Sequence, residues 1–124
     1  MYDKMQLREI GGVHMEKITP EQLAKQLQKK STKIIDVRAA EKFVLNHLVH
    51  EHATVLNIPK TAIFEQEESD APLNLPFSQE DAVILTCTTG NSATRCAHIL
   101  ADKGYNVSVL EGGMTAWNQA KTNK

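Results

Sequence analysis

The chain has 124 residues, of which 41% are hydrophobic and 23% are charged. Fourteen basic and fifteen acidic residues leave a net charge of -1 without a Lys/Arg cluster, so charge gives no case for binding nucleic acid or an anionic membrane. No apolar run approaches the roughly 18 residues of a membrane span, the first residues lack a signal-peptide core, and two cysteines are too few for a disulfide framework. We therefore expect one domain in the reducing cytoplasm.

The first residues differ from the rest of the chain. Gly11-Gly12 interrupts any regular pattern in residues 1–14, whereas clear signals begin soon after Met15. We expect residues 1–14 to form a loosely held N-terminal extension and residues 15–124 to form a single domain.

From Thr19 onward, helical and strand patterns alternate. Thr19 is a candidate N-cap, with Pro20 at the first helical position and Gln22 completing a capping box. The expected elements in chain order are a helix over 20–30, a strand over 33–37, a helix over 40–45, a strand over 54–58, a helix from 59, a strand over 82–85, a helix over 93–101, a strand over 106–110 and a short helix after 113. Short apolar strands alternating with helices predict an α/β fold, in which helices cover both faces of a parallel sheet.

A cysteine marks the junction between a buried strand and a helix. Cys87 follows the apolar run 82–85 and opens a loop. A thiol at this junction meets free backbone N–H groups and the positive end of the helix dipole, which both favour the nucleophilic thiolate. Gly90 lets the backbone curl so that successive N–H groups point at an anion. We predict that Cys87 is a nucleophile at the carboxyl edge of the sheet. Its expected substrate-binding loop consists of Thr88, Thr89, Gly90, Asn91 and Ser92.

Several motifs in the right order resemble the rhodanese family. Ile34-Ile35-Asp36-Val37-Arg38, His47-Leu48 and Asn57-Ile58-Pro59 resemble the first half of a rhodanese domain. Cys87–Ser92 resembles the active-site loop, and Glu111–Trp117 resembles the closing motif. The resemblance implies a rhodanese-like fold and a sulfurtransferase without a cofactor. The loop cysteine of such an enzyme takes a sulfane sulfur from thiosulfate or a persulfide donor and passes it to a thiophilic acceptor.

The charges around the loop depart from the family pattern. Many rhodaneses have arginine where this chain has Thr88, and often a second arginine where it has Ser92. Arg95 lies three residues after Ser92, so the two are expected to share a helix face and Arg95 to supply part of the missing charge. Asp36 is expected to support the site by bonding backbone donors or Arg38.

The second cysteine and the histidines suggest other chemistry. Cys96 falls on the apolar face of its helix, which favours core packing over a disulfide with Cys87. His47, His50 and His52 are close enough in sequence to be considered as metal ligands, but no cysteine or paired carboxylate completes a ligand set. We therefore expect no metal. We expect a solvated loop, about four residues longer than in the family, whose added length holds His50–His52.

Three alternatives compete with the enzyme. Phosphatases of the same fold need an arginine six positions after the cysteine, where this chain has Ala93, so that activity is disfavoured. A non-enzymatic binding or regulatory module stays open because the loop arginines are missing, although Cys87 and Gly90 speak against it. A persulfide carrier also stays open. The expected partners are a small-molecule sulfur donor and a sulfur-acceptor protein.

Overall fold

The computed structural model describes residues 15–67 and 75–122, so the expected extension over residues 1–14 lies outside the described residues. Five parallel strands form one sheet in the order β1-β5-β4-β2-β3. The strands are β1 (Lys17–Ile18), β2 (Thr32–Asp36), β3 (Ala53–Asn57), β4 (Ala82–Thr86) and β5 (Asn106–Leu110). The predicted parallel α/β fold is confirmed. Strand β1 was not predicted, because two residues that pair only with β5 are too short to show a pattern.

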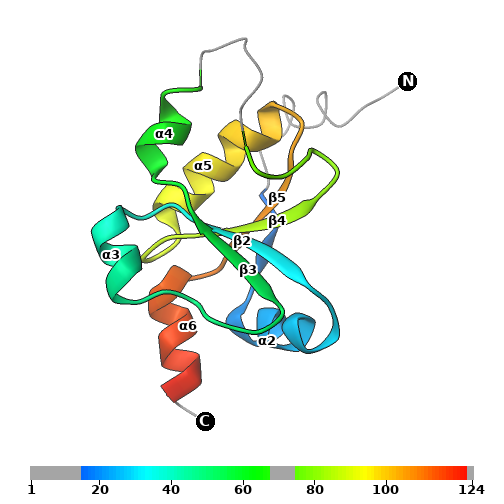
Figure 1. Cartoon of the computed structure of the whole chain (residues 1–124), viewed down its shortest axis with the longest axis vertical. Coiled ribbons are helices and arrows are strands. Elements are labelled where there is room, and N and C mark those ends of the chain that lie inside the picture. Colours follow the sequence, from blue (N-terminus) through cyan, green and yellow to red (C-terminus); the bar gives the residue numbers. More distant parts are fainter. Residues whose placement is uncertain (1–14, 68–74, 123–124) are drawn as a thin grey trace.

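Helices cover both faces of the sheet (Figure 1). One pair packs on one face and a second pair on the other, while α3 lies beside the sheet near the ends of its strands. The helices are α2 (Pro20–Lys29), α3 (Ala40–Leu45), α4 (Lys60–Phe64), α5 (Asn91–Asp102) and α6 (Gly113–Thr122). The pair α4 and α5 contributes to one hydrophobic core, and the pair α2 and α6 contributes to the other.

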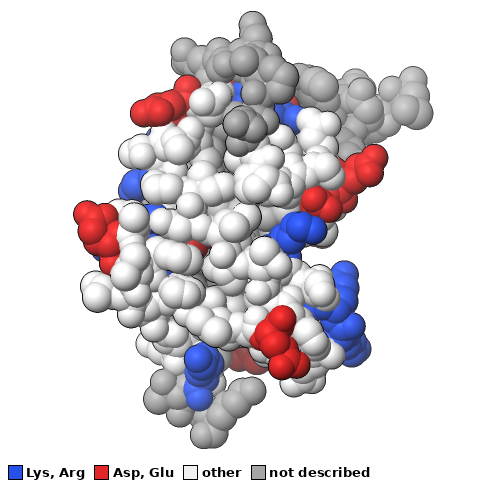
Figure 2. Space-filling view, viewed as in Figure 1, with Lys and Arg blue, Asp and Glu red and all other residues white. Residues whose placement is uncertain are grey.

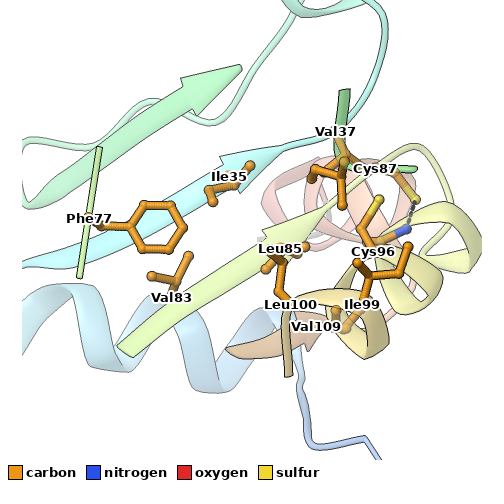
Figure 3. Close-up of a cluster of buried hydrophobic side chains, with 13 residues drawn as sticks. Ile35, Val37, Phe77, Val83, Leu85, Cys87, Cys96, Ile99, Leu100 and Val109 are labelled. Carbon is orange, nitrogen blue, oxygen red and sulfur yellow. Dashed lines mark hydrogen bonds between the residues drawn. The ribbon is translucent and has the colours of Figure 1, made fainter. Parts of the chain in front are cut away.

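The two cores follow from the alternation of side chains along the strands. Ile35 and Leu85 point into the core beneath α5, whereas their neighbours Ile34 and Ile84 point into the core beneath α2. Cys87 and Cys96 lie at one end of the first core and Phe77 at the other (Figure 3). Burial on both faces explains why the strands appear in the sequence as continuous apolar runs.

The histidine insertion lies away from the carboxyl edge of the sheet. It precedes β3, so it sits at the amino ends of the strands. The ring atom His52 Nδ1 lies 2.6 Å from the Leu27 carbonyl oxygen at the end of α2, and His50 Nδ1 accepts a hydrogen bond from His52 N–H. The insertion is thus held against α2, at the opposite edge of the sheet from Cys87.

The surface carries charges of both signs. Lys, Arg, Asp and Glu side chains are interspersed on the face in Figure 2. In the parts of the chain that the structure describes, every helix is too short or too polar to traverse a lipid bilayer.

Candidate active site

Cys87 lies where the sheet topology reverses. It directly follows β4, which sits between β5 and β2 in the sheet. The chain passes from β2 outward to β3 on one side, and from β4 to β5 on the other. The crossovers therefore diverge on either side of the carboxyl ends of β2 and β4, which is where parallel α/β sheets bind ligands.

The sulfur of Cys87 accepts two backbone hydrogen bonds. Gly90 N–H donates to Cys87 Sγ over 3.0 Å, and Ala93 N–H donates over 3.3 Å. Gly90 has φ +104° and caps α5, which begins at Asn91, two residues earlier than predicted. Asn91 and Ser92, which the sequence placed in a loop, therefore form the first helical turn. Ala93 N–H is one of the free donors of that turn, so both contacts favour negative charge on sulfur.

The closing motif holds the loop from behind. Met114 N–H donates to the Cys87 carbonyl oxygen over 2.7 Å, and Thr115 N–H donates to the Thr88 carbonyl oxygen over 2.9 Å. Gly113 allows this approach, because a Cβ atom there would overlap the Cys87 carbonyl oxygen and lie 2.7 Å from the Thr88 carbonyl carbon. The sequence showed only that Glu111–Trp117 resembles the closing motif of the family, and not that this segment anchors the cysteine.

Asp36 and Arg38 join the end of β2 to α3. Arg38 Nε and Nη2 donate to the Asp36 carboxylate, with Nη2 and Oδ2 2.7 Å apart, and Asp36 is fully buried. Arg38 also donates to the backbone oxygen of Asn46, which caps α3. Asn57 Nδ2 donates to the carbonyl oxygens of Asp36 and Arg38, each over 2.9 Å. Because the Asp36–Arg38 ion pair is buried and joined by more than one hydrogen bond, it holds this wall of the site in place.

An open cleft of about 320 Å³ lies above the sulfur. Its lining combines the end of β2, α3, the start of α4 and the loop: Val37, Arg38, Ala39, Lys42, Lys60, Cys87, Thr88, Thr89, Asn91 and Ser92. Most predicted loop residues are thus brought together with Cys87 and Arg38, while Gly90 is buried beneath them. Lys42 and Lys60 were missed. The sequence offered no signal for them, because only the packing of α3 and α4 brings them to the loop.

Arg95 lies on a different side of α5 from the cleft lining. Its guanidinium carbon is 4.3 Å from the centre of the Phe64 ring, and Nη2 is 3.4 Å from a carboxylate oxygen of Glu67. The sequence suggested charge support at the loop, but the guanidinium is directed toward α4 instead. The aromatic face and the carboxylate attract it there.

Cys96 is fully buried in the same core as Cys87. Burial raises the pKa of the Cys96 thiol to about 12, and the charge of Cys87 adds to this effect. Both cysteines are free thiols. Cys96 therefore packs as a small apolar side chain, as its spacing predicted.

The three histidines considered for a metal site, His47, His50 and His52, do not form a ligand set. The His47 ring stacks on Phe43 with ring centres 4.2 Å apart, while His50 and His52 lie in the insertion. Across residues 15–67 and 75–122, no group of three histidine, cysteine or acidic side chains is placed to hold a metal ion.

The comparisons with known proteins agree with this geometry. The family model for the rhodanese-like domain matches residues 19–120, which is most of the chain. The chain belongs to the rhodanese-like domain family. This rhodanese-like chain is 31% identical over 101 residues to a protein of Shewanella oneidensis named thiosulfate sulfurtransferase GlpE; the match covers 80% of this chain and 88% of the relative.

Solved structures show the same fold. A rhodanese-like domain protein of Staphylococcus aureus superposes with a TM-score of 0.65 and 25% identity, covering 83% of this chain and 91% of the other. The human single-domain sulfurtransferase TSTD1 superposes with a TM-score of 0.67, covering 86% and 97%, and at 17% identity this likeness concerns the fold alone.

Proposed function

We propose that this rhodanese-like domain is a sulfurtransferase that carries a sulfane sulfur as a persulfide on Cys87. The observation that carries the proposal is the pair of N–H groups donating to Cys87 Sγ at the floor of an open cleft. The similarity to a protein named as a thiosulfate sulfurtransferase supports thiosulfate as a donor.

The reaction has two covalent steps on Cys87. In the first, the thiolate attacks the outer sulfur of thiosulfate; a bond forms between Sγ and that sulfur, the S–S bond of the donor breaks, and its electron pair leaves with sulfite. In the second, an acceptor such as cyanide or a thiolate attacks the terminal sulfur, and the electron pair of the breaking bond returns to Sγ. Charge balances in each step without an added oxidant or reductant, which is nucleophilic catalysis by covalent intermediate.

The fixed N–H groups assist both steps. They donate to Cys87 Sγ, and the same amide dipoles attract the charged terminal sulfur of the persulfide. In comparable anion-stabilising sites one donor contributes about 3 kcal/mol. Because the cysteine must cycle between thiolate and persulfide, we place the activity in the reducing cytoplasm.

Steady-state kinetics with thiosulfate and cyanide test the function. Thiocyanate formation is expected to show parallel double-reciprocal lines, as a ping-pong reaction does. The variant Cys87→Ser is expected to form no thiocyanate, whereas Cys96→Ser keeps its activity. Turnover by Cys87→Ser would contradict the proposal. A stable persulfide with very slow turnover would favour a persulfide carrier over an enzyme.

A further inference from the structure

The cleft carries positive charge that does not come from its loop. Lys42 of α3 and Lys60 of α4 line it together with Cys87, and within residues 15–67 and 75–122 no aspartate or glutamate lines it. Among the described residues, neither lysine forms an ion pair with a carboxylate. These ammonium groups are therefore available to a ligand in the cleft.

The side chain of Lys60, the first residue of α4, reaches the N-terminal end of α5, which also holds the sulfur of Cys87. Its backbone N–H donates to the Val37 carbonyl oxygen over 2.9 Å, which fixes the start of α4 against the end of β2. Its Nζ donates to Ser92 Oγ over 3.4 Å, in the first turn of α5. Burial raises the pKa of the Cys96 thiol, and the charge of Lys60 acts in the opposite direction, as does that of Arg95. Lys60 and the free N–H groups of α5 thus add their positive potential at one place.

We propose that Lys60, with Ser92 and Lys42, forms a subsite for the anionic end of the sulfur donor. This inference rests on the sulfurtransferase function proposed above. The donor class is a sulfane sulfur attached to a sulfonate-type group, as in thiosulfate and the thiosulfonates. During loading, that group leaves as sulfite or a sulfinate and takes the electron pair of the broken bond. The negative charge of the leaving group is then stabilised by the Lys60 ammonium.

The subsite accounts for the departure of the loop from its family. Positions 88 and 92, where many rhodaneses have arginine, hold Thr88 and Ser92. Lys60 contacts Ser92 directly, so a cation from α4 stands beside the position where the second arginine is missing. The same charge is supplied by a different element of the fold.

Loading rates for donors of different charge test this subsite. We would measure the second-order rate constant of persulfide formation by intact-protein mass spectrometry with thiosulfate, methanethiosulfonate and cysteamine persulfide. Their leaving groups are sulfite with two negative charges, methanesulfinate with one, and the cysteamine thiolate, whose negative charge is balanced by its own ammonium group. For Lys60→Gln we expect a loss of about tenfold with thiosulfate, a smaller loss with methanethiosulfonate and none with cysteamine persulfide. Lys60→Arg should restore most of the rate, because it restores the charge.

A matched variant controls for the change in net charge. Lys25 is exposed on α2, on the opposite face of the sheet, so Lys25→Gln should load at the wild-type rate with every donor. Equal losses for all three donors in Lys60→Gln, or no loss with thiosulfate, would overturn the subsite. Failure of the wild-type protein to load from any donor would instead overturn the proposed function.

Discussion

The two cysteines share one hydrophobic core but differ in what surrounds each sulfur. Cys87 is 5% exposed beneath a cleft, and two N–H groups donate to its sulfur. Cys96 is 0% exposed, and in the described part of the chain no donor to its sulfur is found, so burial raises its pKa to about 12. Burial alone suppresses a thiolate. The two sulfurs therefore differ in the loop geometry around them and not in their position in the core, which supports the role proposed for Cys87.

The largest expected effect comes from moving the loop that creates this difference. Gly113→Ala places a Cβ atom against the Cys87 carbonyl oxygen and 2.7 Å from the Thr88 carbonyl carbon, so the loop must shift. We expect thiocyanate formation to fall by about a hundredfold, because small displacements of a reacting group are costly. Steady-state kinetics with thiosulfate and cyanide measure the effect.

Gly104→Ala is the matched control for that variant. Gly104 has φ +94° and Gly113 has φ +62°, so alanine is strained at both positions, by about 1 kcal/mol or more, and at least as much at Gly104 as at Gly113. Gly104 faces only the flexible side chain of Gln79, away from the loop. A similar loss of activity in both variants would show that general destabilisation, and not the loop, limits the rate.

The second prediction concerns a variant that lacks the buried Cys96 thiol. Cys96→Ala leaves a small cavity in the core beside α5, and we expect the free energy of unfolding to fall by about 1 kcal/mol. Denaturant unfolding monitored through Trp117 fluorescence measures this change. Persulfide loading should stay within about twofold of wild type, since core packing does not alter the N–H groups at Cys87. Lost loading in a folded variant would mean that Cys96 takes part in the reaction.

The smallest expected effect concerns pH. The Cys96 thiol has its ordinary pKa of 9.0 when the chain is unfolded, whereas burial raises this pKa to about 12 in the fold. Its contribution to stability is therefore complete below pH 9.0 and declines as the pH rises toward 12. The stability difference between wild type and Cys96→Ala should therefore shrink by about 1 kcal/mol between roughly pH 8 and pH 10. Unfolding curves of both proteins across this range measure it. A constant difference would show that Cys96 is not the suppressed thiol.

The fold and the place of Cys87 could be predicted because local patterns encode them. Helix α2 begins at Pro20 as its capping box predicted, with Gln22 N–H donating to Thr19 Oγ1 over 3.1 Å and Thr19 N–H donating to Gln22 Oε1 over 2.9 Å. Strand β5 has the predicted bounds, and β2 and β3 begin one residue earlier than predicted. Apolar strands and Gly90 were sufficient to place the cysteine at a strand end before a helix.

Other parts of the site depend on contacts between distant segments. The chain places Lys60 and Ser92 32 residues apart, and their contact needs the packing of α4 beside α5. Gly113 and Cys87 meet only because α6 begins behind the loop. Arg95 has the helical spacing expected for a neighbour of Ser92, but Phe64 and Glu67 of a separate segment decide its direction. Residue spacing predicts a helix face without predicting what that face meets.

The position of the transferred sulfur shows whether Cys87, and not Cys96, carries the persulfide. Reduced wild-type protein is incubated with thiosulfate, its persulfides are trapped by alkylation, and peptides containing Cys87 and Cys96 are analysed separately by mass spectrometry. We expect one added sulfur on Cys87 and none on Cys96, with the sulfur removed by cyanide. Sulfur on Cys96, or on both cysteines in similar amounts, would contradict this expectation.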